Sequence, residues 1–198
     1  MNKRFISIFI VIIIVILAMG VLLFSQKSTI QEDGSNRLST RTSSIAVSSL
    51  VLGISDVPEG YLLQDKAPRV KSELSSEGLE LGWMEGYRTS FSKSEESTLS
   101  ITRIDQLISK YPLENMTKLI VIPGETEGVT VDEIPIERIG DESKAFKIVD
   151  ENDFVGSFGR YEIQFRKMDI LETLKISGTS QNFELLNELA RKAENKIK

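Results

Sequence analysis

The chain has 198 residues, with 24 Lys and Arg against 29 Asp and Glu, and neither histidine nor cysteine, which gives a formal net charge of −5 at pH 7. The missing cysteine and histidine exclude disulfide bonds, thiolate nucleophiles, Cys/His zinc sites and the usual general base near neutral pH. The acidic balance argues against nucleic acid as a partner, because a surface that binds phosphate needs positive charge.

An almost unbroken apolar run occupies residues 5–24, with Ser7 as its only hydroxyl and no charged side chain. A helix of that length spans roughly the 30 Å hydrocarbon core of a bilayer. Lys3 and Arg4 precede the run, and positive charge favours the cytoplasmic side of a membrane. We therefore expect residues 1–4 to be a cytoplasmic tail and residues 5–24 to be an uncleaved, single-pass signal anchor in the lipid bilayer.

Two alternatives for the apolar run remain open. Small side chains at Ala18 and Gly20 suit a signal peptidase, although cleavage there would leave the apolar residues 21–24 at the new N-terminus. The other alternative is a helix buried in a protein core, and the length of the run argues against it.

The segment after the run is polar. Residues 25–45 are rich in Ser, Thr, Gln and Asn, which predicts a flexible linker, because such a segment buries too little surface to offset the entropy of ordering. The remaining residues 46–198 are enough for one domain with a hydrophobic core. Their patterns indicate the α+β class, an antiparallel β-sheet with helices packed on it. We expect this domain to lie outside the cytoplasm.

The first part of the domain mixes apolar and turn-forming residues. Residues 50–52 are a candidate first strand, or the run into one. Residues 56–61, DVPEGY, have the Asp, Pro and Gly chemistry of a turn. Residues 67–81 have helical spacing at Val70 and Leu74, so this part predicts a turn followed by a helix.

A strand predicted at residues 83–91 would place Trp83, Tyr87 and Phe91 on one face. An aromatic row of this kind usually fills the core of a small domain. The alternative is a sugar-binding platform, since aromatic rings stack on the apolar faces of sugars.

The next predicted strand covers residues 98–104. Leu99 and Ile101 would face the core, and Arg103 on the same face would mark where the strand leaves it. Residues 113–122 then predict a short helix or strand that begins after a proline.

The second half of the domain alternates apolar and polar residues. It predicts strands at residues 129–139, 143–149, 161–165 and 170–176, with a tight turn at residues 167–169 between the last two.

The chain ends in an amphipathic helix predicted at residues 181–198, with caps offered by residues 178–180. Covering the domain's own sheet is the favoured role of its apolar face, and docking a partner helix is the alternative. That face consists of Phe183, Leu186, Leu189, Ala190, Ala193 and Ile197.

Three short patterns have both a functional and a plain interpretation. Asp56 with Glu59, and the acidic residues 150–153, are candidate cation sites, although acidic side chains in turns usually face water and the second lacks the ligand spacing of an EF-hand loop. Asn115 begins a sequon for N-glycosylation, which is also a frequent chance match.

The order of motifs resembles poorly characterised extracytoplasmic domains of bacteria and archaea. Those domains pair an IGDE turn, here residues 139–142, with a later hairpin of the FRK type, here within residues 161–171. They open on a turn like residues 56–61 and have a middle block like residues 82–87. The resemblance covers most of residues 50–195.

The resemblance implies a layered fold of the PsbP type, a central antiparallel sheet with helices packed on it. Asp169 stands where Asn or Gly is common in those domains. The resemblance implies a fold and a location outside the cytoplasm, but it does not imply an activity.

The function predicted from the sequence is therefore non-catalytic binding of a partner protein, such as an envelope or membrane protein, or of a small ligand. An enzyme would have to use paired carboxylates, with Glu85, Asp105, Asp141 and Glu142 as candidates, in the manner of a glycosidase. A third hypothesis is an envelope component that assembles with copies of itself. The sequence assigns no catalytic, cofactor-binding or metal-binding residue, and we expect no cofactor.

Overall fold

The computed structural model describes residues 43–198 apart from 96–99, 121, 124–127, 151–157 and 179–180. The anchor predicted at residues 5–24 and the linker as far as residue 42 lie outside the described residues. Within the described part of the chain, no helix is both long and apolar enough to span a bilayer.

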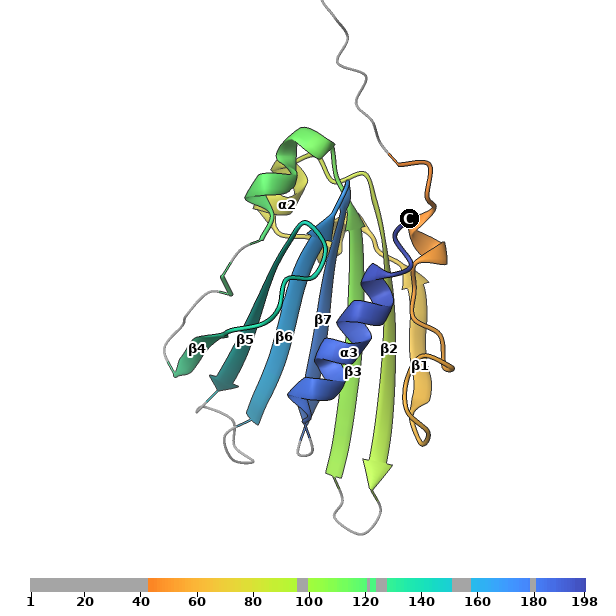
Figure 1. Cartoon of the computed structure of the whole chain (residues 1–198), viewed down its shortest axis with the longest axis vertical. Helices are drawn as coiled ribbons and strands as arrows, with labels where there is room; N and C mark the ends of the chain where they lie inside the picture. The colour runs from red at the N-terminus through yellow and green to blue at the C-terminus, as the bar shows by residue number, and fades with distance from the viewer. Residues whose placement is uncertain (1–42, 96–99, 121, 124–127, 151–157, 179–180) are drawn as a thin grey trace, which may run out of the picture. The chain divides into compact units, whose positions relative to one another are not determined.

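The described residues form seven strands with a few short helices between them (Figure 1). In chain order the elements are the 3-10 helix η1 (Val47–Ser49), β1 (Leu62–Pro68), the 3-10 helix η2 (Lys71–Glu73), α2 (Ser76–Glu80), β2 (Glu85–Glu95), β3 (Ser100–Lys110), the 3-10 helix η3 (Leu113–Lys118), β4 (Val129–Ile134), β5 (Glu142–Asp150), β6 (Phe158–Lys167), β7 (Ile170–Gly178) and α3 (Phe183–Glu194).

The seven described strands form one antiparallel sheet in the order β1-β2-β3-β7-β6-β5-β4. Two meanders, β1 to β3 and β4 to β7, therefore meet where β3 pairs with β7, from Thr102 opposite Gly178 to Lys110 opposite Ile170. The connection from β3 to β4 must cross to the far edge of the sheet, and η3 lies in that connection.

The last hairpin was predicted correctly, and its turn explains the IGDE motif. β6 and β7 flank a two-residue turn in which Met168 has a φ of +57°. Met168 N–H donates to the carboxylate of Asp141 at 2.8 Å, and Asp141 N–H donates to Arg166 O at 2.8 Å. Gly140 is required beside them, because its φ is +63° and a Cβ would lie 2.5 Å from Arg166 O.

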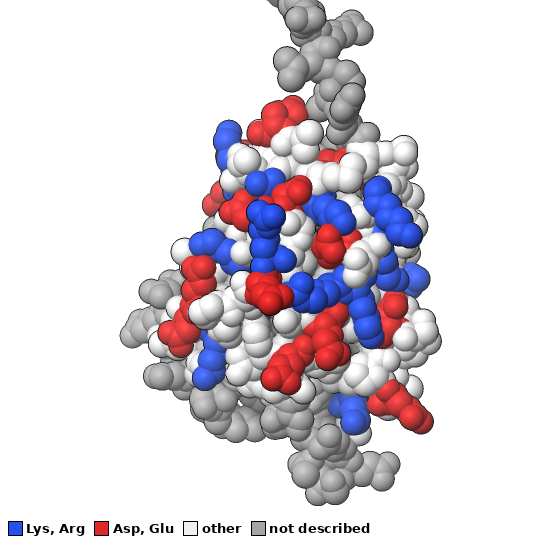
Figure 2. Space-filling view, viewed as in Figure 1, with Lys and Arg blue, Asp and Glu red and all other residues white. Residues whose placement is uncertain are grey.

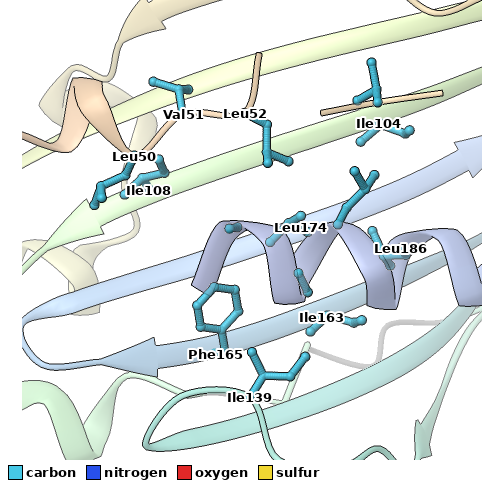
Figure 3. Packing of buried hydrophobic residues seen from close by; sticks show 14 of the residues in the cluster. Leu50, Val51, Leu52, Ile104, Ile108, Ile139, Ile163, Phe165, Leu174 and Leu186 are labelled. Atoms are coloured by element: carbon cyan, nitrogen blue, oxygen red, sulfur yellow. The ribbon is translucent and has the colours of Figure 1, made fainter. Parts of the chain in front are cut away.

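One face of the sheet is covered by α3, which packs on β6 and β7 (Figure 1). The apolar stripe of α3 lies in the main core, so the prediction that it covers the domain's own sheet is confirmed. Figure 3 shows this packing, in which side chains of β3, β6, β7, α3 and the segment after η1 meet: Leu50, Leu52, Ile104, Ile108, Ile163, Phe165, Leu174 and Leu186.

The start of α3 differs from the prediction. Of the predicted caps, Gly178 is the last residue of β7 and residues 179–180 lie outside the described residues. The N-cap of α3 is Asn182. Its carboxamide oxygen accepts from the N–H groups of Glu184 and Leu185 at 2.9 and 3.2 Å. Asn satisfies helix N–H groups as well as Ser or Thr does, so several polar residues before the stripe were equally good candidates.

The end of α3 is held by charge. Lys196 Nζ lies 2.8 Å from the Asp56 carboxylate, which also accepts from Gly53 N–H at 2.7 Å. Burial raises the pKa of Asp56, but the bonds from Lys196 and Gly53 outweigh that effect and lower it overall.

Over the face in Figure 2, which is viewed as in Figure 1, basic and acidic side chains are interspersed.

Of the predictions for the first half, one was wrong and one was only partly right. Residues 50–52 do not form a strand but follow η1, and their side chains are buried in the main core. The helix predicted at residues 67–81 is present only in part: residues 67–68 end β1, and the short helices η2 and α2 lie within the rest. The residues of β1 are half-buried or exposed. An edge strand of this kind lacks the alternating apolar pattern on which strand prediction depends.

The predicted phase of β3 was also wrong by one residue. Ile101 is 58% exposed, whereas Ile104 and Ile108 are fully buried on the opposite face. The polar Gln106 lies between them on the buried face, which disguised the alternation. Leu99 lies outside the described residues.

Candidate functional site

The two faces of the sheet differ in cover. α3 and the η1 segment cover one face, and the opposite face holds a cavity of about 630 Å³ beneath α2 and the η3 connection. Because strand residues alternate between faces, Leu107 and Ser109 of β3 point to this second face together with Leu171 and Thr173 of β7. We call this space the sheet cavity.

The walls of the sheet cavity combine apolar and polar side chains. The apolar walls come from α2, from the η3 connection and from the central strands, and consist of Leu74, Leu81, Leu107, Leu119, Ile122 and Leu171. The polar lining comes mainly from the sheet and its neighbouring segments and consists of Arg69, Ser75, Glu77, Ser109, Tyr111, Glu162, Gln164, Thr173 and Lys175. Apolar walls with a few placed polar groups are typical of small-molecule sites.

At one end of the cavity lies Arg69, whose side chain is 12% exposed. Its Nη1 donates to Ser109 Oγ at 2.7 Å, and its Nε is buried without a hydrogen-bond partner among the described residues. Burial lowers the pKa of Arg69, although the charge of Glu73 opposes this shift. Burial also raises the pKa of Tyr111, although the charge of Arg69 and a hydrogen bond with Ser109 oppose this shift.

Toward the other end of the cavity, Lys175 and Glu162 face each other on β7 and β6. Lys175 Nζ lies 3.2 Å from Glu162 Oε2, and Gln164 Nε2 donates to Glu162 Oε1 at 2.8 Å. Leu171 lies opposite Ser109, the partner of Arg69, and Lys175 is four positions further along β7. At about 3.3 Å per residue the two ends therefore lie roughly 13 Å apart.

A second apolar cluster supports the roof of the cavity. Tyr111, Met116 and Leu119 form its buried centre, and Leu81 and Trp83 pack against it. Trp83 is the only tryptophan of the chain, so its fluorescence reports on this end of the cavity.

A hollow of about 440 Å³ adjoins the sheet cavity and shares Leu107 and Lys175 with it. Its charged side chains form ion pairs: Arg103 Nε lies 2.8 Å from Asp105, and Arg88 contacts Asp65 and also Glu73 outside the hollow. Ser90 Oγ in the same lining has no hydrogen-bond partner among the described residues. The sheet cavity is the larger of these two spaces, and Arg69 Nε in its wall has no hydrogen-bond partner among the described residues.

The three aromatic residues of the predicted row are buried to different degrees. Phe91 is fully buried in the main core and Tyr87 packs against that core. Trp83 precedes β2 and belongs to the second cluster. The prediction of a core residue is confirmed for Phe91, whereas Trp83 and Tyr87 are half-buried. The prediction that all three share one strand face is wrong, because Trp83 lies before β2.

The four carboxylates considered for catalysis occupy separate positions, each with its own partner. Glu85 Oε1 lies 3.7 Å from Lys110, and Asp105 lies 2.8 Å from Arg103. Asp141 accepts from the backbone of Met168, and Glu142 pairs with Arg166 at 2.9 Å. Each of the four carboxylates therefore has a polar contact within the described part of the chain.

The other short patterns also have structural roles or lie outside the description. Asp56 holds Lys196, and residues 151–153 of the acidic cluster lie outside the described residues. Asn115 Nδ2 donates to Leu81 O at 3.0 Å, so this amide already supports the cavity roof. Among the residues that the structure describes, no group of three or more His, Cys, Asp or Glu is placed to hold a metal ion.

Two buried charged sites escaped the sequence analysis. Lys110 and Asp169 both bond to the backbone of Ser43 and are 7% and 1% exposed, and Glu172 is fully buried. Gln106 Nε2 donates to Glu172 Oε2 at 2.7 Å and its oxygen accepts from Leu52 N–H at 2.8 Å. Glu172 could have been found as the polar member of an inward-facing alternation that Ile170, Leu174 and Ile176 otherwise fill.

Comparison with known proteins finds similar solved structures but no similar sequence. No protein-family model matches the sequence, and no curated protein matches it. The structure is similar to the extracellular domain of PknH from Mycobacterium tuberculosis, with a TM-score of 0.53 and 10% identity over 76% of this chain and 94% of that one. An Rv0999 ortholog from Mycobacterium smegmatis gives a TM-score of 0.48 at 10% identity, covering 77% of this chain and 96% of that one.

At 10% identity the PknH comparison shows a shared fold alone. It supports the predicted antiparallel sheet with a helix packed on it. The more specific resemblance to the PsbP type stays a prediction.

Proposed function

We propose that this protein is a membrane-anchored, extracytoplasmic domain that binds a small ligand in the sheet cavity without transforming it. The observation that carries the proposal is the cavity itself, whose volume of about 630 Å³ falls within the range of small-molecule sites. Its apolar walls would hold the body of a ligand, and its polar ends would orient it.

Binding rather than catalysis is supported by the state of the polar groups. Both oxygens of Glu162, a carboxylate at the cavity wall, are already occupied by Lys175 and Gln164. The chain has no histidine or cysteine to replace it as base or nucleophile. Partner-protein binding, hydrolysis and self-assembly have no comparable feature among the described residues in their favour.

The location of the domain is part of the proposal. It is supported by the apolar run at residues 5–24 with basic residues before it. The PknH domain whose fold is similar is an extracellular domain. We expect protease added to intact cells to digest a tag at the C-terminus while a tag at the N-terminus stays intact. Protection of the C-terminal tag until the cells are lysed would place the domain in the cytoplasm and contradict the proposal.

Ligand binding is tested by filling the cavity. In the full chain, Thr173→Phe places a ring on the cavity floor, whereas the control Thr130→Phe places it on the exposed side of β4. We expect compounds from a library of small amphipathic molecules to change the Trp83 emission of the parent and of Thr130→Phe. The affinity of these compounds for Thr173→Phe should fall by about tenfold or more, a loss of about 1.4 kcal/mol.

The reason is steric, since the added ring takes the volume that the ligand needs. Compounds that bind Thr173→Phe as tightly as the parent would contradict the assignment of the cavity, and a library without binders would contradict the function.

A further inference from the structure

Arg69 is a residue of the cavity wall whose hydrogen-bond donors are not all used. Its backbone is fixed, because Arg69 N–H donates to Gly86 O at 3.0 Å directly after β1. Its guanidinium is held against the sheet by the bond from Nη1 to Ser109 Oγ at 2.7 Å. The side chain therefore lies at one place in the wall of the cavity.

The donors of this guanidinium are incompletely used. A guanidinium has five N–H donors. Among the described residues, Nη1 donates to Ser109 and Nη2 donates to Glu73 O at a long 3.4 Å, while Nε has no hydrogen-bond partner. A largely buried cation with unused donors is unfavourable unless an anion or another acceptor forms hydrogen bonds with those donors.

The neighbouring carboxylates are engaged elsewhere. Glu73 Oε2 comes no closer than 3.8 Å to Arg69 Nε, and Glu73 Oε1 is in close contact with Arg88. Arg88 also pairs with Asp65, whose Oδ2 lies 2.6 Å from Arg88 Nε. Arg69 therefore keeps the weakest ion pair of this cluster and is the cation best placed to receive a new anion.

The surroundings of Arg69 add two hydroxyl groups and an apolar surface. Ser109 and Tyr111 both line the cavity beside it, and hydroxyls can donate to an anion. Leu107 and Leu171 continue the cavity floor from this polar end. The carboxylates that share the lining do not oppose an anion here, because Glu162 is paired with Lys175 and Glu77 is exposed to solvent.

We infer that the ligand of the sheet cavity is a small organic acid, whose anionic group is bound by Arg69 while its compact apolar body lies on Leu107 and Leu171. This inference rests on the proposed function and narrows it to a chemical class. A carboxylate matches the fork of a guanidinium and can accept two of its donors at once.

The test compares three probes with the same body: 3-phenylpropionate, 3-phenylpropanamide and 3-phenylpropylammonium. Binding to the full chain is followed by the emission of Trp83 and by calorimetry. We expect the carboxylate to bind about 10- to 100-fold more tightly than the amide, the range given by one charge-assisted hydrogen bond, and the ammonium to bind most weakly.

Variants assign the selectivity to Arg69. Arg69→Met should reduce the affinity for the carboxylate to that for the amide, and leave the amide unchanged. Arg69→Lys should retain part of the preference. Tyr111→Phe keeps Arg69 in place and should weaken the carboxylate severalfold, so it tests the same site if Arg69→Met does not fold.

Equal binding of amide and carboxylate to the parent would overturn the inference, and so would an equal loss of both in Arg69→Met, or binding of none of the probes. These outcomes differ from failure of the proposed function. If the library contains compounds that Thr173→Phe excludes, the cavity binds ligands even though its ligand is not an acid.

Discussion

Replacing Lys110 with methionine should destabilise the domain by about 3–5 kcal/mol, the usual loss when one partner of a buried ion pair is removed. The side chain of Lys110 is 8% exposed and that of Asp169 is 1% exposed, with Nζ and Oδ2 3.9 Å apart. Methionine has a similar length but no charge, so Asp169 would keep a buried carboxylate without its cation.

The loss would also reach the start of the domain. Lys110 Nζ donates to Ser43 O at 2.5 Å, and the Asp169 carboxylate accepts from Ser43 N–H at 2.7 Å. The pair thus holds both backbone polar groups of Ser43, which lies within the linker predicted at residues 25–45, so this end of the predicted linker is bonded to the domain. We expect Lys110→Met to free this segment and to increase its cleavage by protease.

Urea unfolding of the full chain, followed by Trp83 emission, measures the effect. Lys144→Met is the matched control, because Lys144 pairs with Glu133 on the outer strands at 3.3 Å and both side chains are partly exposed. Such pairs contribute about 0–1 kcal/mol. The double variant Lys110→Met with Asp169→Asn should lose less than Lys110→Met alone, since it leaves no buried charge. Equal losses in Lys110→Met and Lys144→Met would show that the buried pair does not hold the domain.

Replacing Glu172 with glutamine should change how stability depends on pH. Burial raises the pKa of Glu172 to about 8 from its ordinary value of 4.5, although the bond from Gln106 and the charge of Lys196 partly oppose the shift. Below pH 4.5 the group is protonated in both the folded and the unfolded state. Between 4.5 and about 8 the unfolded state loses its proton while the folded state keeps it, so stability falls as the pH rises.

The parent should therefore lose up to about 1.4 kcal/mol for each pH unit within that window through this group, and the loss should level off above it. Glu172→Gln cannot ionise, so its stability should exceed that of the parent by a margin that grows with pH across the window.

The measurement is the free energy of unfolding of both proteins at several pH values between 4 and 9, from urea titrations. Glu188→Gln, on the exposed side of α3, removes one carboxylate without touching the core and serves as the control. If the difference between Glu172→Gln and the parent is the same at every pH, then Glu172 does not titrate as its burial implies.

The sequence predicted the elements whose side chains follow a local period. Tyr161, Ile163 and Phe165 alternate on β6, and the stripe of α3 repeats at helical spacing, so both were recognised without knowledge of their partners. It failed where a partner decides the pattern. Gln106 and Glu172 face the core because each has the other, and β1 forms a strand because β2 offers it an edge.

By itself the sequence predicted the antiparallel sheet, the positions of most strands along the chain, the last hairpin and the helix that covers the sheet. These features depend on residues that are neighbours in the sequence. The candidate site depends on the pairing of β3 with β7, which places Leu107 opposite Thr173, and on the crossing connection that brings Leu119 over them. Arg69 reaches the same cavity from the end of β1. Only the tertiary structure decided these contacts, because residues so distant in sequence leave no local pattern that records their meeting.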